Sequence, residues 1–350
     1  MNFKTANVNA AISAVSEGIT PTSYIVLSTT ITLCVSEGNL YLVTNPDDSE
    51  VWFSAKVGSI SEPFTPVSVD GAQFMKAIAC CGETCSISRV DDSLIINNGK
   101  GDLKLPILVD DNGNDAFHPF FTPSGTDVVV KNLDKLKMVS ANASKTMDSI
   151  ALRHIYTDND CSFTSDGVNI SKGPGITGIP MLITGRMQSF FNKHADTVIK
   201  DSGDYFWFVS ANDGCEARFT KAFQDFIEQF PLDVLQGEFQ QEVEHSVLID
   251  MAAFRNSMGF LGVIADAADD YAVTIAQENP NELILKCKQS VQKIPCESVA
   301  GSGPWEVAVD CTAANSKFNQ YDGKVQLDVY ASQLACVGPV TTSIGLIIDD

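Results

Sequence analysis

The glycine run Gly173-Pro174-Gly175-Ile176-Thr177-Gly178 fits the G-x-G-x-x-G spacing of dinucleotide-binding turns. In such a site the turn opens a helix, and the N-terminus of that helix binds the pyrophosphate. Here the residues that follow, 179–183, have the apolar pattern of a strand, and Pro174 stiffens the turn. We therefore predict an ordinary turn between strands at this point rather than a nucleotide site.

A second candidate is the oxygen-rich run Asp110-Asp111-Asn112-Gly113-Asn114-Asp115, which suggests a calcium loop. An EF-hand loop has Gly at its sixth position and a bidentate Glu at its twelfth. In this run Gly113 is fourth, and the twelfth residue is Phe121. A connecting segment between domains is the better interpretation.

Three cysteines, Cys80, Cys81 and Cys85, are close enough in sequence to ligate a metal ion. No second Cys or His pair follows at zinc-finger spacing, and thiols near the end of a helix commonly belong to a core. The four histidines are scattered, and there is no H-E-x-x-H, G-x-S-x-G or P-loop motif. The sequence therefore predicts no metal, no cofactor and no catalytic residues.

The composition limits the class of protein. The chain has 350 residues, enough for two or three domains, and 44% of them are hydrophobic, as in an ordinary globular protein. Its 44 acidic and 23 basic residues give a net charge of −21, which argues against a surface coated with nucleic-acid-binding patches. We find no apolar run long enough to span a membrane and no secretory signal, and the ten cysteines lack framework spacing. We expect a cytoplasmic protein with reduced thiols.

The elements that must position any functional residues repeat three times, about every 120 residues. Each repeat has a helix, a group of alternating strands, a strand that leads into a second helix, and short closing strands. We predict the six helices at 7–17, 70–81, 132–147, 184–196, 250–265 and 311–320. The strands are predicted at 24–35, 39–44, 51–57, 66–70, 85–90, 93–97, 102–105, 127–131, 149–156, 161–165, 168–171, 180–184, 204–210, 215–221, 243–249, 271–277, 282–288, 305–310, 324–330, 333–337 and 341–348. The fold class is α+β, with three repeated domains at 1–120, 121–236 and 237–350, each with two helices packed on antiparallel sheets.

Several short runs occur in the order and spacing of one known family. They are Met1-Asn2-Phe3-Lys4, Val67-Ser68-Val69-Asp70-Gly71-Ala72-Gln73-Phe74, Gly99-Lys100-Gly101-Asp102-Leu103-Lys104-Leu105-Pro106, Phe163-Thr164-Ser165-Asp166-Gly167 and Phe230-Pro231. The whole chain resembles the bacterial sliding clamp, the β subunit of DNA polymerase III. This resemblance implies three clamp domains per chain, and two chains that close head to tail into a ring around duplex DNA.

Two departures from the family lie where its members bind the short motifs of polymerases and clamp loaders. After Asp166-Gly167 the turn continues with Val168 and Asn169 instead of the usual His and Arg, and the usual Met-Pro-Met ending is replaced by Ile344-Gly345-Leu346-Ile347-Ile348-Asp349-Asp350. By family position, the partner-peptide pocket consists of Gly167, Val168, Asn169, Gly345, Leu346 and Ile347. Such divergence suits a clamp encoded by a phage or a plasmid.

Charge is unevenly distributed along the chain. The predicted helices carry five acidic residues and eight basic ones, which makes them +3 and leaves −24 for the rest of the chain. A ring that slides needs weak, sequence-independent phosphate contacts on its inner helices. The residues predicted to face DNA are Lys76, Lys135, Lys137, Lys145, Arg186, Lys193, Arg255 and Lys317.

Ring closure is expected to pair an edge strand of domain one, near Leu103 and Leu105, with an edge of domain three, supported by Leu261 and Ile264. The predicted function is a DNA sliding clamp, a processivity factor that encircles double-stranded DNA and tethers the polymerase. Its partners would be DNA, the polymerase, the clamp loader and a second copy of the chain. The alternative is an acidic, non-enzymatic scaffold protein that uses the same fold without encircling DNA.

Overall fold

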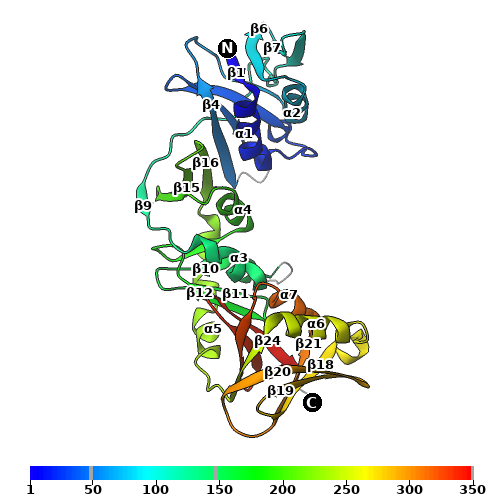
Figure 1. The fold of residues 1–350 in the computed structure, drawn as a ribbon. Helices are drawn as coiled ribbons and strands as arrows, with labels where there is room; N and C mark the ends of the chain where they lie inside the picture. The colour runs from blue at the N-terminus through cyan, green and yellow to red at the C-terminus, as the bar shows by residue number, and fades with distance from the viewer. Residues whose placement is uncertain (47–49, 145–148, 348–350) are drawn as a thin grey trace. The chain divides into compact units, whose positions relative to one another are not determined.

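The structure, a computed structural model, describes residues 1–46, 50–144 and 149–347. By its contacts the chain forms two compact units, Met1–Val129 with Ser189–Ala222 and Val130–Gln188 with Phe223–Asp350. Both units combine helices with antiparallel sheets (Figure 1), which confirms the predicted α+β class. The three-domain boundaries remain a prediction.

The first unit contains two sheets. The four-stranded sheet has the order β1 (Asn2–Lys4), β6 (Thr84–Val90), β7 (Ser93–Asn97) and β8 (Asp102–Pro106). The eight-stranded sheet has the order β5 (Val67–Asp70), β2 (Thr30–Ser36), β3 (Asn39–Thr44), β4 (Val51–Ser59), β16 (Cys215–Thr220), β15 (Tyr205–Ser210), β14 (Thr197–Asp201) and β9 (Thr126–Val128). The main helices are α1 (Thr5–Val15) and α2 (Gly71–Ala79), together with the part of α4 (Gly185–Lys193) from Ser189 onward.

Helix placement in this unit follows from the sequence pattern. Val8, Ile12 and Val15 of α1 are buried, as their helical spacing predicts. The carboxylate of Asp70 accepts a hydrogen bond from the backbone N–H of Gln73 and so caps α2. The predicted strand at 24–35 is wrong in its first part, where the 3-10 helix η2 (Val26–Thr29) precedes β2. The hydroxyls of Thr29 and Thr30 donate to the carbonyls of Val26 and Leu27, and these local bonds replace ladder pairing.

In the second unit the strands form one twelve-stranded arrangement. Its order is β13 (Met181–Ile183), β10 (Ile155–Thr157), β11 (Cys161–Ser165), β12 (Ile170–Pro174), β24 (Thr341–Ile347), β21 (Trp305–Asp310), β18 (Ala272–Asn279), β19 (Glu282–Cys287), β20 (Ser290–Ala300), β17 (His245–Asp250), β22 (Lys324–Val329) and β23 (Gln333–Val337). Strand β23 also pairs with β24, so the last eight strands close on themselves. Its α-helices are α3 (Leu136–Val139), α5 (Leu232–Glu238), α6 (Met251–Gly262) and α7 (Cys311–Lys317), together with the part of α4 up to Gln188.

The helix predicted at 132–147 is wrong in its extent. The described part is a 3-10 turn, η3 (Leu133–Lys135), the short α3, and a second 3-10 turn, η4 (Ser140–Asn142), after which Ala143 is extended. The buried amide of Asn142 donates to the hydroxyl of Ser171, 3.1 Å away on β12. This tertiary bond, and the tendency of Ser and Asn to bond locally, outweigh the helical pattern.

Other differences concern segments with weak patterns. The predicted strand at 149–156 is replaced in part by the 3-10 helix η5 (Ala151–Arg153), and β10 starts only at Ile155. The structure adds β14, β20, α5 and the 3-10 helix η6 (Ala222–Gln229), which the sequence pattern did not predict. The remaining 3-10 turns are η1 (Ser16–Gly18) and η7 (Ala267–Asp269).

Two strand pairings join neighbouring repeats. Strand β4 pairs with β16, from Val51 opposite Phe219 to Ala55 opposite Cys215. Strand β12 pairs with β24, from Ile170 opposite Ser343 to Lys172 opposite Thr341. In both cases the third strand after a repeat's first helix pairs antiparallel with the last strand of the next repeat. We call these two pairings the joints.

Candidate partner and DNA interfaces

The glycine run at 173–178 has a structural explanation. Gly173 lies on β12, and a Cβ there would come within 2.6 Å of Val139 on α3. A Cβ on Gly175 would come within 2.4 Å of the carbonyl oxygens of Asp158 and Asn159. The chain then continues to strand β13 rather than to a helix. These glycines allow close packing and do not form a nucleotide-binding turn.

The oxygen-rich run at 110–115 bonds within the chain. One oxygen of Asp110 accepts the backbone N–H groups of Asn112 and Asn114, both at 2.9 Å. Asp115 forms a two-bond ion pair with Arg89. Among the described residues, no three His, Cys, Asp or Glu side chains group so that they could hold a metal ion, and all ten cysteines are free thiols. Within the same residues, no helix is long and apolar enough to cross a membrane.

The basic residues predicted to face DNA differ in their surroundings. Lys76 on α2 and Lys137 on α3 are exposed. Arg186 at the start of α4 is half-buried, and Lys145 lies outside the described residues. The other four each pair with a carboxylate of the chain: Lys135 with Asp134, Lys193 with Glu17, Arg255 with Asp322 and Lys317 with Asp166. Exposed lysines attract a polyanion more strongly than lysines already paired with carboxylates, so Lys137 and Lys76 are the stronger candidates of this set for contacts to phosphate.

The six residues predicted for the partner pocket lie on neighbouring parts of the second unit, because β12 pairs with β24. Gly167, Val168 and Asn169 form the turn between β11 and β12, and Gly345, Leu346 and Ile347 end β24. A Cβ on Gly345 would come within 2.7 Å of a Val168 methyl group, so the absence of a side chain at Gly345 lets Val168 lie directly over β24. Val168 is 67% exposed. We call residues 166–169 the partner turn.

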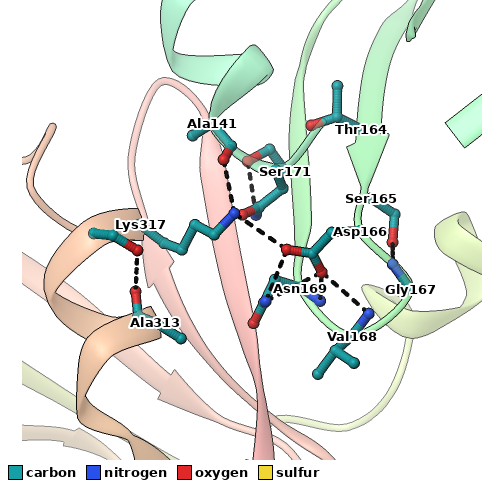
Figure 2. A network of polar contacts seen from close by, with 12 residues as sticks. Ala141, Thr164, Ser165, Asp166, Gly167, Val168, Asn169, Ser171, Ala313 and Lys317 are labelled. Atoms are coloured by element: carbon teal, nitrogen blue, oxygen red, sulfur yellow. Dashed lines mark hydrogen bonds and ion pairs between the residues drawn. The ribbon is translucent and has the colours of Figure 1, made fainter. Parts of the chain in front are cut away.

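Asp166 organises the partner turn (Figure 2). Its carboxylate accepts the backbone N–H of Asn169 at 2.8 Å and that of Val168 at 3.2 Å. The turn also needs a positive φ of 94° at Gly167, a conformation that glycine adopts without strain. Burial works to raise the pKa of Asp166, but the hydrogen bonds from Asn169 and the charge of Lys317 outweigh it and hold the pKa below its usual value. The sequence resemblance pointed to this turn but gave no sign that Asp166 itself would be its organiser.

The residues predicted for self-association lie in two places. In the first unit, Leu103 on β8 is 47% exposed and Leu105 is buried. Both line a groove of about 610 Å³ between α2 and β8, whose other apolar wall includes Ala77 and Ile96. Strand β8 pairs with β7 on one side, and no described strand pairs with its other side. This part of the first unit therefore offers a free strand edge beside an apolar groove.

In the second unit, Leu261 is fully buried in the core, so it has no surface to offer a partner directly, and Ile264 just after α6 is partly exposed. Phe260 and Val263 beside them are 60% and 82% exposed. Strand β20, which was not predicted, lies near α6. Its residues 290–295 pair with β19, and among the described strands none pairs with their other side. Residues 296–300 pair with β17 instead. Strand β19 joins β20 through a two-residue turn after Cys287. This hairpin turn lacks the Gly or Asn that usually marks such turns in a sequence, so the sequence pattern did not predict β20.

Solved structures with this fold match the chain from end to end. A β sliding clamp of C. crescentus has a TM-score of 0.78 at 13% identity and covers 99% of both chains. The β subunit of DNA polymerase III from Thermotoga maritima has a TM-score of 0.75 at 15% identity over 100% of this chain and 99% of that chain. A Helicobacter pylori β clamp, in complex with 3,4-difluorobenzamide, reaches 0.79 at 14% identity over the full length of both.

No family model matches the chain, and no curated protein matches it by sequence. The structural matches confirm the resemblance at the level of the fold: over its whole length the chain has the architecture of a β sliding clamp.

Proposed function

We propose that this chain is a DNA sliding clamp, a processivity factor whose copies join head to tail into a ring around double-stranded DNA. The ring has no catalytic role. It tethers the polymerase to its template by raising the effective local concentration of the enzyme, and it holds DNA without reading its sequence.

The observation that carries this proposal is the set of strand edges left over by the two joints. Each repeat supplies one third strand (β4, β12 or β20) and one last strand (β8, β16 or β24). The pairs β4–β16 and β12–β24 are formed within the chain, so β20 and β8 remain. The same pairing between β20 of one copy and β8 of the next is a head-to-tail contact, which forms a ring when the rotation closes.

The side chains near these two edges support the pairing. Val291 on the free half of β20 is 47% exposed, as is Leu103 on β8. The exposed Phe260 near the end of α6 and Val263 just after it are suited to the apolar groove between α2 and β8 of the next copy. The unpaired edges of β8 and of β20 could also pair with other chains and cause aggregation, and pairing within a ring would cover both edges.

Partner proteins would bind at the partner turn and β24. The exposed Val168 over Gly345 gives an apolar contact, and the polymerase and clamp loader would reach it through short peptide segments. Duplex DNA would contact the exposed Lys137 and other helix lysines. We place this activity in the cytoplasm of a bacterial cell or of a phage-infected host.

The second candidate is an acidic scaffold protein with the clamp fold that never encircles DNA. The net charge of −21, together with the neutralisation of four candidate cations by the chain's own carboxylates, is the observation that favours it. It predicts an assembly that ignores DNA topology.

The decisive test is retention on circular and linear DNA of equal length after loading. A clamp stays on a closed circle and leaves a linear duplex through its free ends. Linearising the circle with a restriction enzyme should then release the bound protein. Equal loss from both substrates would reject the clamp and favour the scaffold.

A further inference from the structure

Lys317, predicted from the sequence to face DNA, directs its ammonium group to two acceptors of the chain itself. It is the last residue of α7, and its Nζ lies 3.1 Å from Oδ2 of Asp166 and 2.9 Å from the carbonyl oxygen of Ala141 (Figure 2). The side chains of Lys317 and Asp166 are 18% and 24% exposed. An ammonium group with two such acceptors in a half-buried place gains little by moving to a phosphate in water.

The carboxylate that Lys317 contacts also holds the partner turn. Both oxygens of Asp166 accept the side-chain amide of Asn169, at 3.1 and 3.0 Å. One of them also accepts the backbone N–H groups of Val168 and Asn169. Asp166 is therefore a single group that links the end of α7 to the backbone of the turn.

We propose that Lys317 is a positioning residue for the partner turn, which it holds through Asp166, and not a contact to DNA. The inference deepens the proposed function, because it rests on the assignment of this turn to partner binding. Removing the ammonium takes away the ion pair that Asp166 forms among the described residues, so the carboxylate can turn toward water and release the backbone N–H groups it now accepts.

The chain contains a matched control lysine. Lys137 and Lys317 line the same pocket of about 820 Å³ between α3 and α7. Lys137 is exposed, whereas Lys317 is tied to Asp166 and Ala141. The two lysines therefore carry the same charge on the same face, and only one of them reaches the partner turn.

The test measures amide hydrogen exchange at Val168 and Asn169 in the full chain, without DNA or partner. We expect Lys317→Met to speed exchange at these amides about tenfold, Lys317→Arg to restore it, and Lys137→Met to leave it unchanged. Exchange in the core of β17 should stay constant in all variants, which separates a local effect from a loss of global stability.

A second measurement uses a short blunt duplex at low salt. Lys137→Met should weaken duplex binding and its salt dependence, whereas Lys317→Met should leave both unchanged, and the duplex should not alter exchange at Val168 and Asn169. Unchanged exchange in Lys317→Met, or a loss of duplex binding in Lys317→Met equal to that in Lys137→Met, would overturn the inference. The exchange result stands whether or not the chain forms a ring, so it is separate from the circular-DNA test.

Discussion

The guanidinium carbon of Arg218 lies 3.4 Å from the ring centroid of Phe121. Arg218 is on β16, directly opposite Trp52 of β4, and Phe121 is in the segment 107–125 that connects the first repeat to the second. Trp52 and Tyr205 also lie within 4.4 Å of the guanidinium, measured to their ring centroids. Only 7% of Arg218 is exposed, so this cation–π cluster fastens the connecting segment across the first joint.

Replacing Arg218 should therefore loosen this joint. Arg218→Ala removes the cation–π contacts and leaves a space among the rings, and we expect a loss of about 3 kcal/mol in the free energy of unfolding. Denaturant titration measures the loss, and proteolysis within 107–125 should become faster. Arg255→Ala is the control, because its guanidinium pairs with the exposed Asp322 and should contribute less than about 1 kcal/mol. Equal losses in both variants would contradict this role.

His118 should make stability depend on pH. Its ring is buried in the connecting segment, where Nε2–H donates a hydrogen bond to the carbonyl oxygen of Leu27, and burial lowers its pKa to about 4. The unfolded chain, with an ordinary His pKa of about 6.5, binds a proton that the folded ring rejects, so stability falls as pH drops from 6.5 to 4. At a pH of about 5 the loss is about 2 kcal/mol relative to neutral pH.

Urea titration at both pH values checks this effect. His118→Gln keeps a polar side chain but does not titrate. Between neutral pH and a pH of about 5, the free energy of unfolding of this variant should therefore fall by about 2 kcal/mol less than that of the unchanged protein. Identical pH dependence in the two proteins would show that His118 does not contribute.

Gly345 and Val168 should be energetically coupled. Gly345→Ala places a methyl group where a Val168 methyl lies, 2.7 Å from an ideal Cβ, so the partner turn must move. We expect a cost of about 1–2 kcal/mol. Val168→Ala should relieve most of it in the double variant, because the two substitutions share one contact. Thermal unfolding of the four proteins gives the coupling energy, and strictly additive costs would refute the contact.

Self-association should depend on the free half of β20. Val291→Lys puts a charge at the proposed interface and should weaken dimerisation about tenfold or more, as measured by sedimentation velocity over a range of concentrations. Leu103→Lys on β8 should have the same effect. Val299→Lys is the matched control, since Val299 is on the same strand and exposed, but in the half that pairs with β17. If Val299→Lys dissociates the protein as strongly as Val291→Lys, another surface forms the interface.

Much of the fold was predictable because local patterns agree with tertiary structure. Strong alternation predicted β3, β7, β11, β21 and β23 at their observed bounds or within a residue or so of them. The aspartates before α2, α6 and α7 cap those helices as their positions suggest. The order of these elements was enough for the resemblance, which the full-length structural matches confirm at the level of the fold.

The parts that failed depend on contacts distant in sequence. Strand β20 has polar residues and Pro295 in its run, and it is a strand because β19 and β17 lie beside it. The helix predicted from Asn132 is interrupted because the side-chain amide of Asn142 donates a hydrogen bond to the hydroxyl of Ser171 on β12. The ion pair of Lys317 joins residues 151 positions apart. No pattern within one segment reveals which lysine of a helix will pair with a carboxylate from a distant turn.

The two joints inside the chain also determine how the proposed ring would respond to dilution. Where both strands belong to one polypeptide, their local concentration is fixed by the chain and does not change with the amount of protein. Pairing between β8 and β20 joins separate molecules, so mass action governs that contact alone. Every opening of the ring would then occur at the same kind of seam, and the amount of protein that the cell makes would set how often that seam is found open.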